Sequence, residues 1–215
     1  MNTDLVIGMA GSGGDGIVSA GESLLTAAAL EGYHGVMTKS FGPQIRGGES
    51  SFKLRLCTQK VLNSGGTLDI AVALNWEDFL KFGGELPVSG STIVVYDSNT
   101  NVEVDKIPLV GVTPAEVLSV PIEQMARETG GSDRAKNTVV LGLMAGWLGI
   151  GKEQMLAGIR KKLSKKGAEI VDKAEKAFHA GLAYAQEHPL QQSRRRKLDS
   201  PPRICGPKLL VKTPW

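Results

Sequence analysis

The sequence predicts an α/β fold with a largely parallel β-sheet. Short apolar runs typical of buried strands alternate with helical patterns in the first part of the chain, and helical patterns fill the second part. The clearest unit lies at the start, where the apolar run Leu5–Ile7 is followed by the glycine-rich segment Gly8–Gly16 and then by a helical pattern. This order of strand, glycine-rich turn and helix favours binding of an anion at the start of the helix.

The first elements follow from apolar periodicity. Leu5–Met9 is expected to form a buried strand, and Ile17–Leu30, rich in Ala and Leu, is expected to form a helix. A second strand is expected at Val36–Thr38. The segment Ser40–Ser50 is too rich in Gly, Pro and charged residues for regular structure. Apolar and polar residues alternate in Phe52–Leu56, which predicts a strand with one face covered.

The middle of the chain continues the alternation. The continuous apolar run Ile70–Leu74 is typical of a central parallel strand. A short helix is expected at Asn75–Phe82, because its first residue is a good N-cap. Strands are predicted at Thr92–Tyr96 and Pro108–Val112. A helix is predicted at Pro114–Glu128, since proline is favoured at the first helical position.

Three helices are expected in the last third of the domain. Asn137–Leu148 is apolar nearly all round and is therefore expected to be buried. Lys152–Leu163 and Ala168–Gln186 are amphipathic, and Gly167 is expected to separate them. The chain therefore reads as alternating strands and helices followed by a helical layer.

The chain has the length of one domain followed by a tail. Its 215 residues, of which 41% are hydrophobic, are enough for a substantial core. We expect the domain to span residues 1–187 and a basic, proline-containing tail or linker to span 188–215. The net charge is only +3, and the basic excess gathers near the C-terminus, as in the run Arg194–Lys197. Nucleic acid is therefore not an expected partner.

The composition also argues against several classes of site. Cys57 and Cys205 are far apart, with no CxxC motif, which disfavours a zinc site, an iron–sulfur cluster or a disulfide scaffold held by this chain. The N-terminal residues lack the pattern of a signal peptide, and no apolar run reaches the ~18 residues of a membrane span. We therefore expect a cytoplasmic protein that does not bind membranes.

The glycine-rich loop satisfies the GxGxxG pattern over Gly11–Gly16. The acidic residue that would bind a free ribose at the end of the second strand is replaced by Lys39 and Ser40. This change disfavours NAD and favours a phosphate-rich ligand such as coenzyme A or NADP. The alternative is that these glycines only allow close packing of strand and helix. No asparagine completes a thiamine-diphosphate motif after Gly14–Gly16, so thiamine diphosphate is not expected on this chain.

Two further segments carry candidate residues. Arg46 lies beside two glycines and is suited to a carboxylate or phosphate, or else it is a solvated arginine in a surface turn. Asn137 opens the buried helix next to the cations Arg134 and Lys136, either as an N-cap only or as an N-cap beside an anion. No histidine, serine or cysteine is placed for nucleophilic catalysis, so no catalytic residue is expected within this chain.

Four segments together carry a family resemblance: Gly11–Gly21 (GSGGDGIVSAG), Ser40–Ser50 (SFGPQIRGGES), Asp69–Asn75 and Asn137–Gly142 (NTVVLG). Over residues 4–187 the chain resembles the gamma domain of the 2-oxoacid:ferredoxin oxidoreductases, which include pyruvate, 2-oxoglutarate, 2-oxoisovalerate and indolepyruvate enzymes. The aromatic-Gly-Pro-x-x-Arg-Gly-Gly stretch is the most specific element of the resemblance.

The resemblance implies a Rossmann-like three-layer α/β/α sandwich with a mostly parallel sheet. It implies a multisubunit enzyme that oxidatively decarboxylates a 2-oxoacid, of the 2-oxoglutarate or pyruvate type, to its acyl-CoA. Thiamine diphosphate, Mg and iron–sulfur clusters would be held by partner alpha, beta and iron–sulfur subunits, with ferredoxin as electron acceptor. Coenzyme A would contact this chain.

The resemblance also assigns site residues by position. The residues expected to bind the cofactor are Gly11, Ser12, Gly13, Gly14, Gly16, Lys39, Arg134, Lys136 and Asn137. The residues expected at an interface near the active site are Arg46, Gly47 and Gly48. Asp15 and Ala174 replace residues usual in the family, which suggests a divergent branch of the 2-oxoglutarate type. The alternatives are a non-catalytic scaffold subunit and an NADP-binding Rossmann-type protein.

Overall fold

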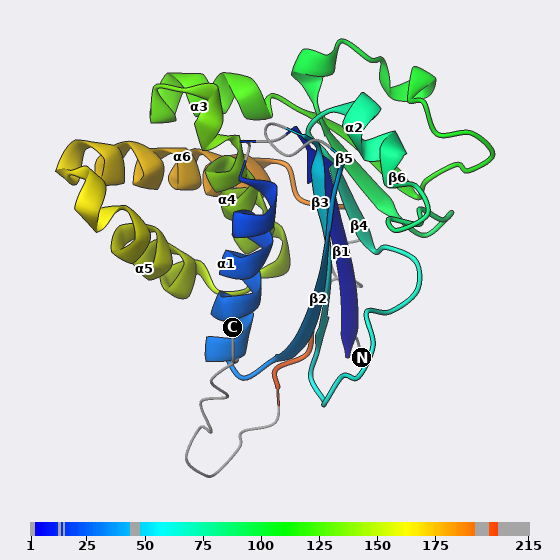
Figure 1. Ribbon diagram of the computed structural model, residues 1–215, viewed down its shortest axis with the longest axis horizontal. Coiled ribbons are helices and arrows are strands. Elements are labelled where there is room, and N and C mark those ends of the chain that lie inside the picture. Colours follow the sequence, from blue (N-terminus) through cyan, green and yellow to red (C-terminus); the bar gives the residue numbers. More distant parts are fainter. Residues whose placement is uncertain (1–2, 13, 15, 44–47, 192–197, 202–215) are drawn as a thin grey trace.

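The computed structural model describes residues 3–12, 14, 16–43, 48–191 and 198–201. In these residues a six-stranded sheet lies between two layers of helices (Figure 1). The strands are β1 (Asp4–Gly11), β2 (His34–Phe41), β3 (Ser50–Cys57), β4 (Ile70–Ala73), β5 (Ile93–Asp97) and β6 (Glu116–Val120). The α-helices are α1 (Ile17–Leu30), α2 (Trp76–Lys81), α3 (Ile122–Gly130), α4 (Lys136–Leu148), α5 (Lys152–Leu163) and α6 (Ala168–Glu187). The predicted three-layer α/β/α sandwich with a mostly parallel sheet is confirmed.

The order of the strands across the sheet is β2-β3-β1-β4-β5-β6. β1, β4, β5 and β6 run parallel, each paired with the next. β3 is antiparallel to both β1 and β2, so β2 points in the same direction as β1. The β1–α1–β2 connection therefore passes over β3, whereas the second strand of a Rossmann unit lies beside the first. The end of β2 is consequently one strand further from the glycine-rich loop than the sequence pattern predicts.

The two faces of the sheet are covered unequally. α1, α3, α4, α5 and α6 lie on one side of the sheet, and α2 lies on the other (Figure 1). Along β1 the side chains alternate between the two sides, as a period of two residues requires. Ile7 and Met9 join the larger apolar cluster under the helices, while Val6 and Ala10 join the smaller cluster under α2.

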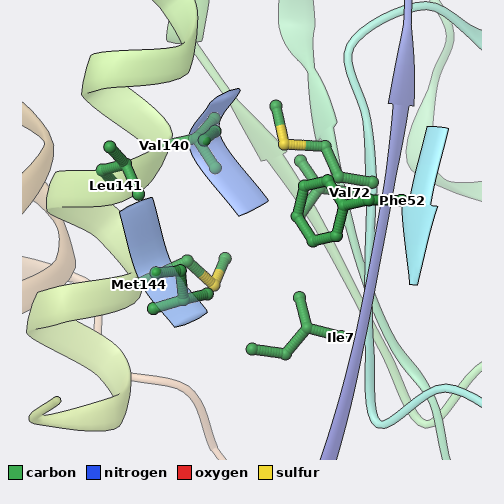
Figure 2. Close-up of a pocket in the computed structure, with 9 residues that line it drawn as sticks. Ile7, Phe52, Val72, Val140, Leu141 and Met144 are labelled. Carbon is green, nitrogen blue, oxygen red and sulfur yellow. The ribbon is translucent and has the colours of Figure 1, made fainter. Parts of the chain in front are cut away.

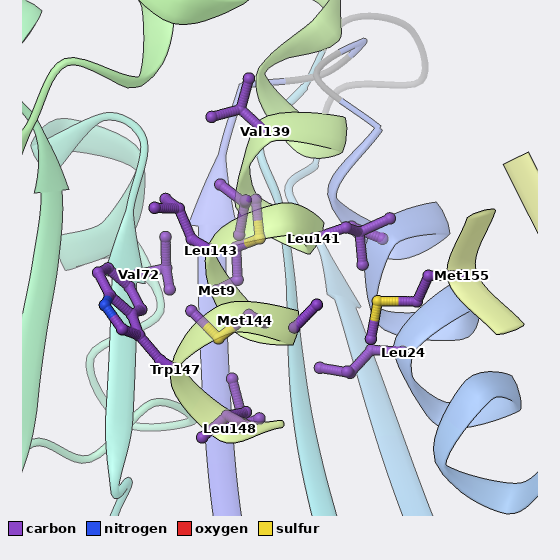
Figure 3. Close-up of a cluster of buried hydrophobic side chains, with 14 of the residues drawn as sticks. Met9, Leu24, Val72, Val139, Leu141, Leu143, Met144, Trp147, Leu148 and Met155 are labelled. Carbon is purple, nitrogen blue, oxygen red and sulfur yellow. The ribbon is translucent and has the colours of Figure 1, made fainter. Parts of the chain in front are cut away.

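Helix α4 is buried nearly all round, as its apolar sequence predicts. Figure 3 shows it in front of the sheet, with its side chains packed among Met9, Val72 and Leu24. Helix α6 covers its other side so closely that the backbones of the two helices are in contact. A Cβ atom on Gly142 would lie 2.0 Å from the carbonyl oxygen of Phe178, and one on Gly181 would lie 2.1 Å from the carbonyl oxygen of Val139.

Two elements predicted between residues 108 and 128 are wrong. Residues 108–112 contain bends rather than a strand, and the predicted helix at Pro114–Glu128 is instead β6 followed by α3. Glu116–Val120 pairs in register with all five residues of β5, which provides backbone hydrogen bonds that an isolated segment lacks. Pro121 then ends the strand, and α3 begins at Ile122. Tertiary pairing therefore decides the structure of a segment whose sequence fits either state.

The prediction that β3 has one covered face is also wrong, because both faces are covered. Phe52 and Leu54 are buried under the helices. On the opposite face Lys53 is only 9% exposed, and its Nζ donates to the carbonyl oxygens of Gly65 at 2.9 Å and Gly66 at 2.5 Å. Burial lowers the pKa of the Lys53 ammonium. The loop before β4 therefore covers the polar face of β3.

The described residues beyond α6 pack against the domain. Leu190 and Leu198 are buried in the larger cluster, and Nε1 of Trp147 donates to the carbonyl oxygen of His188 at 2.9 Å. The backbone N–H of Gln191 donates to Glu116 at 3.2 Å. A domain boundary at residue 187 stays a prediction, but the packed part of the chain continues past it.

The contact between α4 and α6 gives a stability prediction. We expect Gly142→Ala to lower the free energy of unfolding by about 2 kcal/mol, because the new methyl group would meet backbone atoms of α6 that cannot move aside alone. Gly158→Ala, in the exposed face of α5 with no atom within 4 Å of its Cβ position, is the matched control. It should raise the free energy of unfolding by about 0.5–1 kcal/mol through helix propensity. Urea denaturation of both variants measures the difference, and equal effects would contradict it.

Candidate functional site

The candidate site lies at the carboxyl ends of β1 and β4. After β1 the chain enters α1 on one side of the sheet, and after β4 it enters α2 on the other side (Figure 1). Such a change of side between neighbouring parallel strands opens a crevice, and ligands of open α/β sheets bind at this position. The glycine-rich loop and the start of α2 therefore flank the expected binding place.

The glycine-rich loop has the backbone that only glycine adopts freely. Gly14 has φ +101° and Gly16 has φ +71°, both in the left-handed range. Gly16 is the N-cap of α1, and its carbonyl oxygen accepts from the N–H of Ala20 at 2.9 Å. Among the described residues no side chain caps this helix. Gly13 and Asp15 lie outside the described residues.

Asn137 lies directly against the glycine-rich loop. A Cβ atom on Gly16 would be 2.6 Å from Nδ2 of Asn137, so the amide occupies the space that glycine leaves open. Asn137 is not an N-cap, and that interpretation is wrong. A 3₁₀ turn capped by Ser132 runs directly into α4, so α4 begins at Lys136 and Asn137 lies in its first turn. The first turns of α1 and α4 therefore meet at this edge of the sheet.

Lys136 is held close to buried carboxylates. Its side chain is 12% exposed, and its Nζ lies 3.8 Å from Oε2 of Glu123. The nearby Asp97 carboxylate accepts the backbone N–H of Glu123 at 3.1 Å and of Asn99 at 3.2 Å. Burial raises the pKa of Asp97, and the charge of Lys136 opposes this rise. Lys136 therefore brings its positive charge to the edge of the site together with acidic partners, whereas Arg134 is exposed.

Lys39 is not brought to the glycine-rich loop in the way that its sequence position suggests. It lies on β2, and β3 separates it from β1. Its ammonium forms an ion pair with Glu22 of α1. The assignment of Lys39 to ligand binding stays a prediction, and Glu22 would compete with a ligand for this lysine.

The structure adds a polar cluster that the sequence analysis missed. The Ser12 hydroxyl donates to Oδ2 of Asp78 at 2.6 Å, and Nζ of Lys81 donates to Oδ1 of the same carboxylate at 3.2 Å. Asp78 is only 8% exposed. The confirmed N-cap of α2, Asn75, accepts the backbone N–H of Asp78 at 3.2 Å. An acidic first turn directly after a buried strand was the signal available in the sequence.

The two ends of the segment between β2 and β3 meet at the same edge. The N–H of Gly42 donates to the carbonyl oxygen of Glu49 at 2.8 Å, which joins the two ends of the loop. Oε1 of Glu49 lies 3.7 Å from Nζ of Lys81. Gly48 is described as irregular backbone, while Arg46 and Gly47 lie outside the described residues.

The interior of the domain offers no room for a ligand at the described residues near this edge. A cavity of about 10 Å³ lies between the sheet and helices α1 and α4 (Figure 2). Only apolar side chains line it, including Ile7, Phe52, Val72 and Met144. Such a void holds at most about one water molecule and provides no hydrogen bond. A ligand would therefore bind at the surface of the site, against backbone and loop atoms.

The described residues hold no cluster of metal-ligating side chains. No group of three or more metal-ligating side chains is found among them, and none of their helices is long and apolar enough to cross a membrane. Cys57 is buried, and burial raises the pKa of its thiol to about 11. The first turn of α1, which no described side chain caps, is suited to binding an anionic group, whereas the N–H of Lys136 at the start of α4 already donates to the carbonyl oxygen of Asp133.

Comparison with known proteins gives one matching family model, described as pyruvate ferredoxin/flavodoxin oxidoreductase, over residues 6–184. The ketoisovalerate oxidoreductase subunit VorA of Methanothermobacter marburgensis is 33% identical over 183 residues, covering 84% of this chain and 36% of that protein. The chain therefore spans about a third of the length of this relative.

The chain is also similar to solved structures. The 2-oxoglutarate:ferredoxin oxidoreductase from Magnetococcus marinus, with 2-oxoglutarate, coenzyme A and succinyl-CoA bound, has a TM-score of 0.79 and 30% identity, covering 94% of this chain and 34% of that chain. The gamma subunit of a keto/oxoacid ferredoxin oxidoreductase from Geobacter sulfurreducens has a TM-score of 0.64 and 25% identity, covering 86% of this chain and 97% of that one. A chain of this length thus matches both a part of a long chain and nearly all of a short one.

The apposition of Gly16 and Asn137 gives a prediction for a double-mutant cycle. We expect Gly16→Ala to cost about 1–2 kcal/mol of unfolding free energy from its left-handed backbone, and more from the contact with Asn137. In an Asn137→Ala background the loss should be smaller by about 0.5 kcal/mol or more. Gly14→Ala is the control, because it has φ +101° but no atom within 4 Å of its Cβ position. Additive effects of Gly16→Ala and Asn137→Ala would contradict the contact.

The raised pKa of Cys57 gives a reactivity prediction. A thiol with a pKa of about 11 carries little thiolate at neutral pH, and its side chain is almost inaccessible. In a Cys205→Ser variant, reaction of Cys57 with a thiol reagent at pH 8 should be about 100-fold slower in the folded than in the urea-unfolded protein. The folded rate should rise as the pH approaches the raised pKa. Equal rates in the two states would contradict the burial of this thiol.

Proposed function

Because the chain belongs to the pyruvate ferredoxin/flavodoxin oxidoreductase family, we propose that it is the gamma component of a multisubunit 2-oxoacid:ferredoxin oxidoreductase. In that complex it contributes to coenzyme A binding and to subunit assembly. The observation that carries the proposal is the meeting of the glycine-rich loop with Asn137 at the point where the chain changes sides of the sheet.

Coenzyme A suits this site because its phosphates are anionic. The first turn of α1 directs backbone N–H groups and the positive end of its dipole to this edge of the sheet. Glycines at positions 11, 14 and 16 allow a phosphate to approach the backbone closely. The amide of Asn137 supplies a donor beside that loop, and Lys136 adds positive charge. The bound coenzyme A in the Magnetococcus marinus structure supports this ligand.

The oxidation itself is assigned to partner subunits. In this proposal the chain binds and orients coenzyme A, while proton and electron transfer take place on partner subunits. Thiamine diphosphate with Mg, on partner alpha and beta subunits, would supply the stabilised carbanion for decarboxylation, and iron–sulfur clusters on a partner subunit would carry electrons to ferredoxin. The product would be the acyl-CoA of a 2-oxoacid of the 2-oxoglutarate or pyruvate type. Such a complex would be cytoplasmic.

The segment around Arg46 is proposed to contact the partner subunits near the active site. The bond between Gly42 and Glu49 holds the two ends of this segment together at the edge where the glycine-rich loop leaves β1. A planar guanidinium between glycines is suited to a carboxylate of a partner or a substrate. This placement would join coenzyme A binding and subunit contact at one edge of the sheet.

A scaffold without ligand is the second candidate, and one observation favours it. The space beside Gly16 is filled by Asn137, so packing alone accounts for that glycine. An NADP site is less favoured, because β3 separates Lys39 from the glycine-rich loop and Lys39 pairs with Glu22. The two candidates predict different results for an Asn137 variant: coenzyme A binding weakens if this is a coenzyme A site and does not change if the chain is a scaffold.

The proposal is tested on the complex purified through a tag on this chain. Recovery of thiamine-diphosphate and iron–sulfur subunits, with dye reduction that requires both a 2-oxoacid and coenzyme A, is the expected result. Asn137→Ala should raise the KM for coenzyme A about tenfold, as loss of a hydrogen bond to a charged group does. Asn99→Ala, after β5 and two strands away from β1, is the control and should leave KM unchanged. An unchanged KM in both variants would favour the scaffold.

A further inference from the structure

Two loops that both carry sequence motifs leave the sheet side by side. β1 pairs with β3 so that Gly11 lies opposite Ser50. Ser12 is therefore the first residue of the glycine-rich loop, and Glu49 is the last residue of the loop between β2 and β3, at the same edge. Backbone pairing places these two residues next to each other although they belong to different loops.

Helix α2 contacts both loops through a single chain of polar groups. The Ser12 hydroxyl donates to Asp78 at 2.6 Å, and Lys81 donates to the other oxygen of Asp78 at 3.2 Å. Lys81 Nζ also lies 3.7 Å from Oε1 of Glu49. Ser12, Asp78, Lys81 and Glu49, here called the α2 bridge, thus connect the start of one loop with the end of the other.

The two carboxylates of the α2 bridge are shielded from water. The Asp78 side chain is 11% exposed and the Glu49 side chain is 13% exposed, whereas Lys81 is 43% exposed. The hydrogen bond to Asp78 raises the pKa of the Lys81 ammonium, which stays positively charged between the two carboxylates. Charge pairs whose acidic members are shielded couple more strongly than pairs on an open surface.

Glu49 also fixes the other end of its own loop. Its carbonyl oxygen accepts the N–H of Gly42 at 2.8 Å. A Cβ atom on Gly42 would lie 2.3 Å from Cδ of Glu49, so the carboxyl group rests directly on the glycine. A change in the carboxyl group of Glu49 would therefore alter packing at both ends of the loop between β2 and β3.

We propose that Asp78 is a positioning residue that couples the two loops: it holds Ser12 of the glycine-rich loop and, through Lys81, holds Glu49 of the loop between β2 and β3. The coupling keeps the start of the glycine-rich loop and the end of the loop between β2 and β3 in one relative position. The effect of this coupling on kinetics rests on the proposed function. The coupling predicts that Glu49, which is remote from the glycine-rich loop in sequence, affects the KM for coenzyme A.

The first test is a double-mutant cycle in the purified complex. Ser12→Ala and Glu49→Gln should each raise the KM for coenzyme A by about threefold or more, and their combination should be clearly less than the product of the two. In an Asp78→Asn background, Glu49→Gln should have no further effect on KM. Independent, multiplicative effects would overturn the proposal, because Ser12 would then act on the ligand directly.

Matched variants separate the α2 bridge from general stability. Glu77 also lies 3.7 Å from Nζ of Lys81 but is 82% exposed, so Glu77→Gln should leave KM unchanged. Lys81→Arg keeps the positive charge and should retain the coupling, whereas Lys81→Met should abolish it. Equal effects of Glu77→Gln and Glu49→Gln would overturn the proposal.

A second measurement is independent of coenzyme A. Hydrogen exchange of the complex without ligand should be faster in peptides that cover residues 11–16 when Glu49 is changed to Gln, and unchanged there for Glu77→Gln. Faster exchange in a complex that makes no use of coenzyme A would support the coupling while the proposed function fails. Unchanged exchange in the Glu49→Gln complex would overturn the coupling, whatever the ligand.

Discussion

The arrangement of this domain depends on the burial of one helix that is apolar on all sides. α4 needs cover on every face, and the sheet, α1 and α6 provide it. Backbone contact with α6 is possible only because Gly142 and Gly181 lack side chains. Once α4 is fixed in this way, its first turn has a single place, beside the start of α1. The position of Asn137 against Gly16 is therefore a consequence of core packing.

Two buried carboxylates lie at the carboxyl edge of the sheet, and both have hydrogen-bond partners. Asp97, the last residue of β5, accepts two backbone N–H groups. Asp78 of α2 accepts from Ser12 and Lys81, and its backbone N–H donates to Asn75. A buried carboxylate without such partners would cost several kcal/mol. These carboxylates therefore fix the loops between which a ligand and a partner subunit are proposed to meet. In the proposed function, the oxidation is left to cofactors on other subunits.

Much of the fold was predictable because the relevant signals are local. The bounds of α1 and α5 agree with those predicted from periodicity, and Asn75 caps α2 as expected. The errors fall where pairing with a distant segment decides the outcome. Glu116–Val120 is a strand only because β5 offers an open edge, and the polar face of β3 is covered only because the Gly65–Gly66 turn folds over Lys53. The candidate site divides in the same way: the glycine-rich loop was visible in the sequence, whereas Asp78 and Glu49 were not.

The sequence by itself determined the fold class, the family and the glycine-rich loop, because these depend on hydrophobic periodicity and on short contiguous motifs. Only the tertiary structure decided which distant residues meet. In the folded chain β3 lies between β1 and β2, and Lys39 pairs with Glu22. Asn137 packs against Gly16, and polar groups of α2 connect two loops. Such contacts are set by strand order and by the packing of α4 and α6. No local pattern of residue types carries that information, because it depends on how the whole chain closes its core.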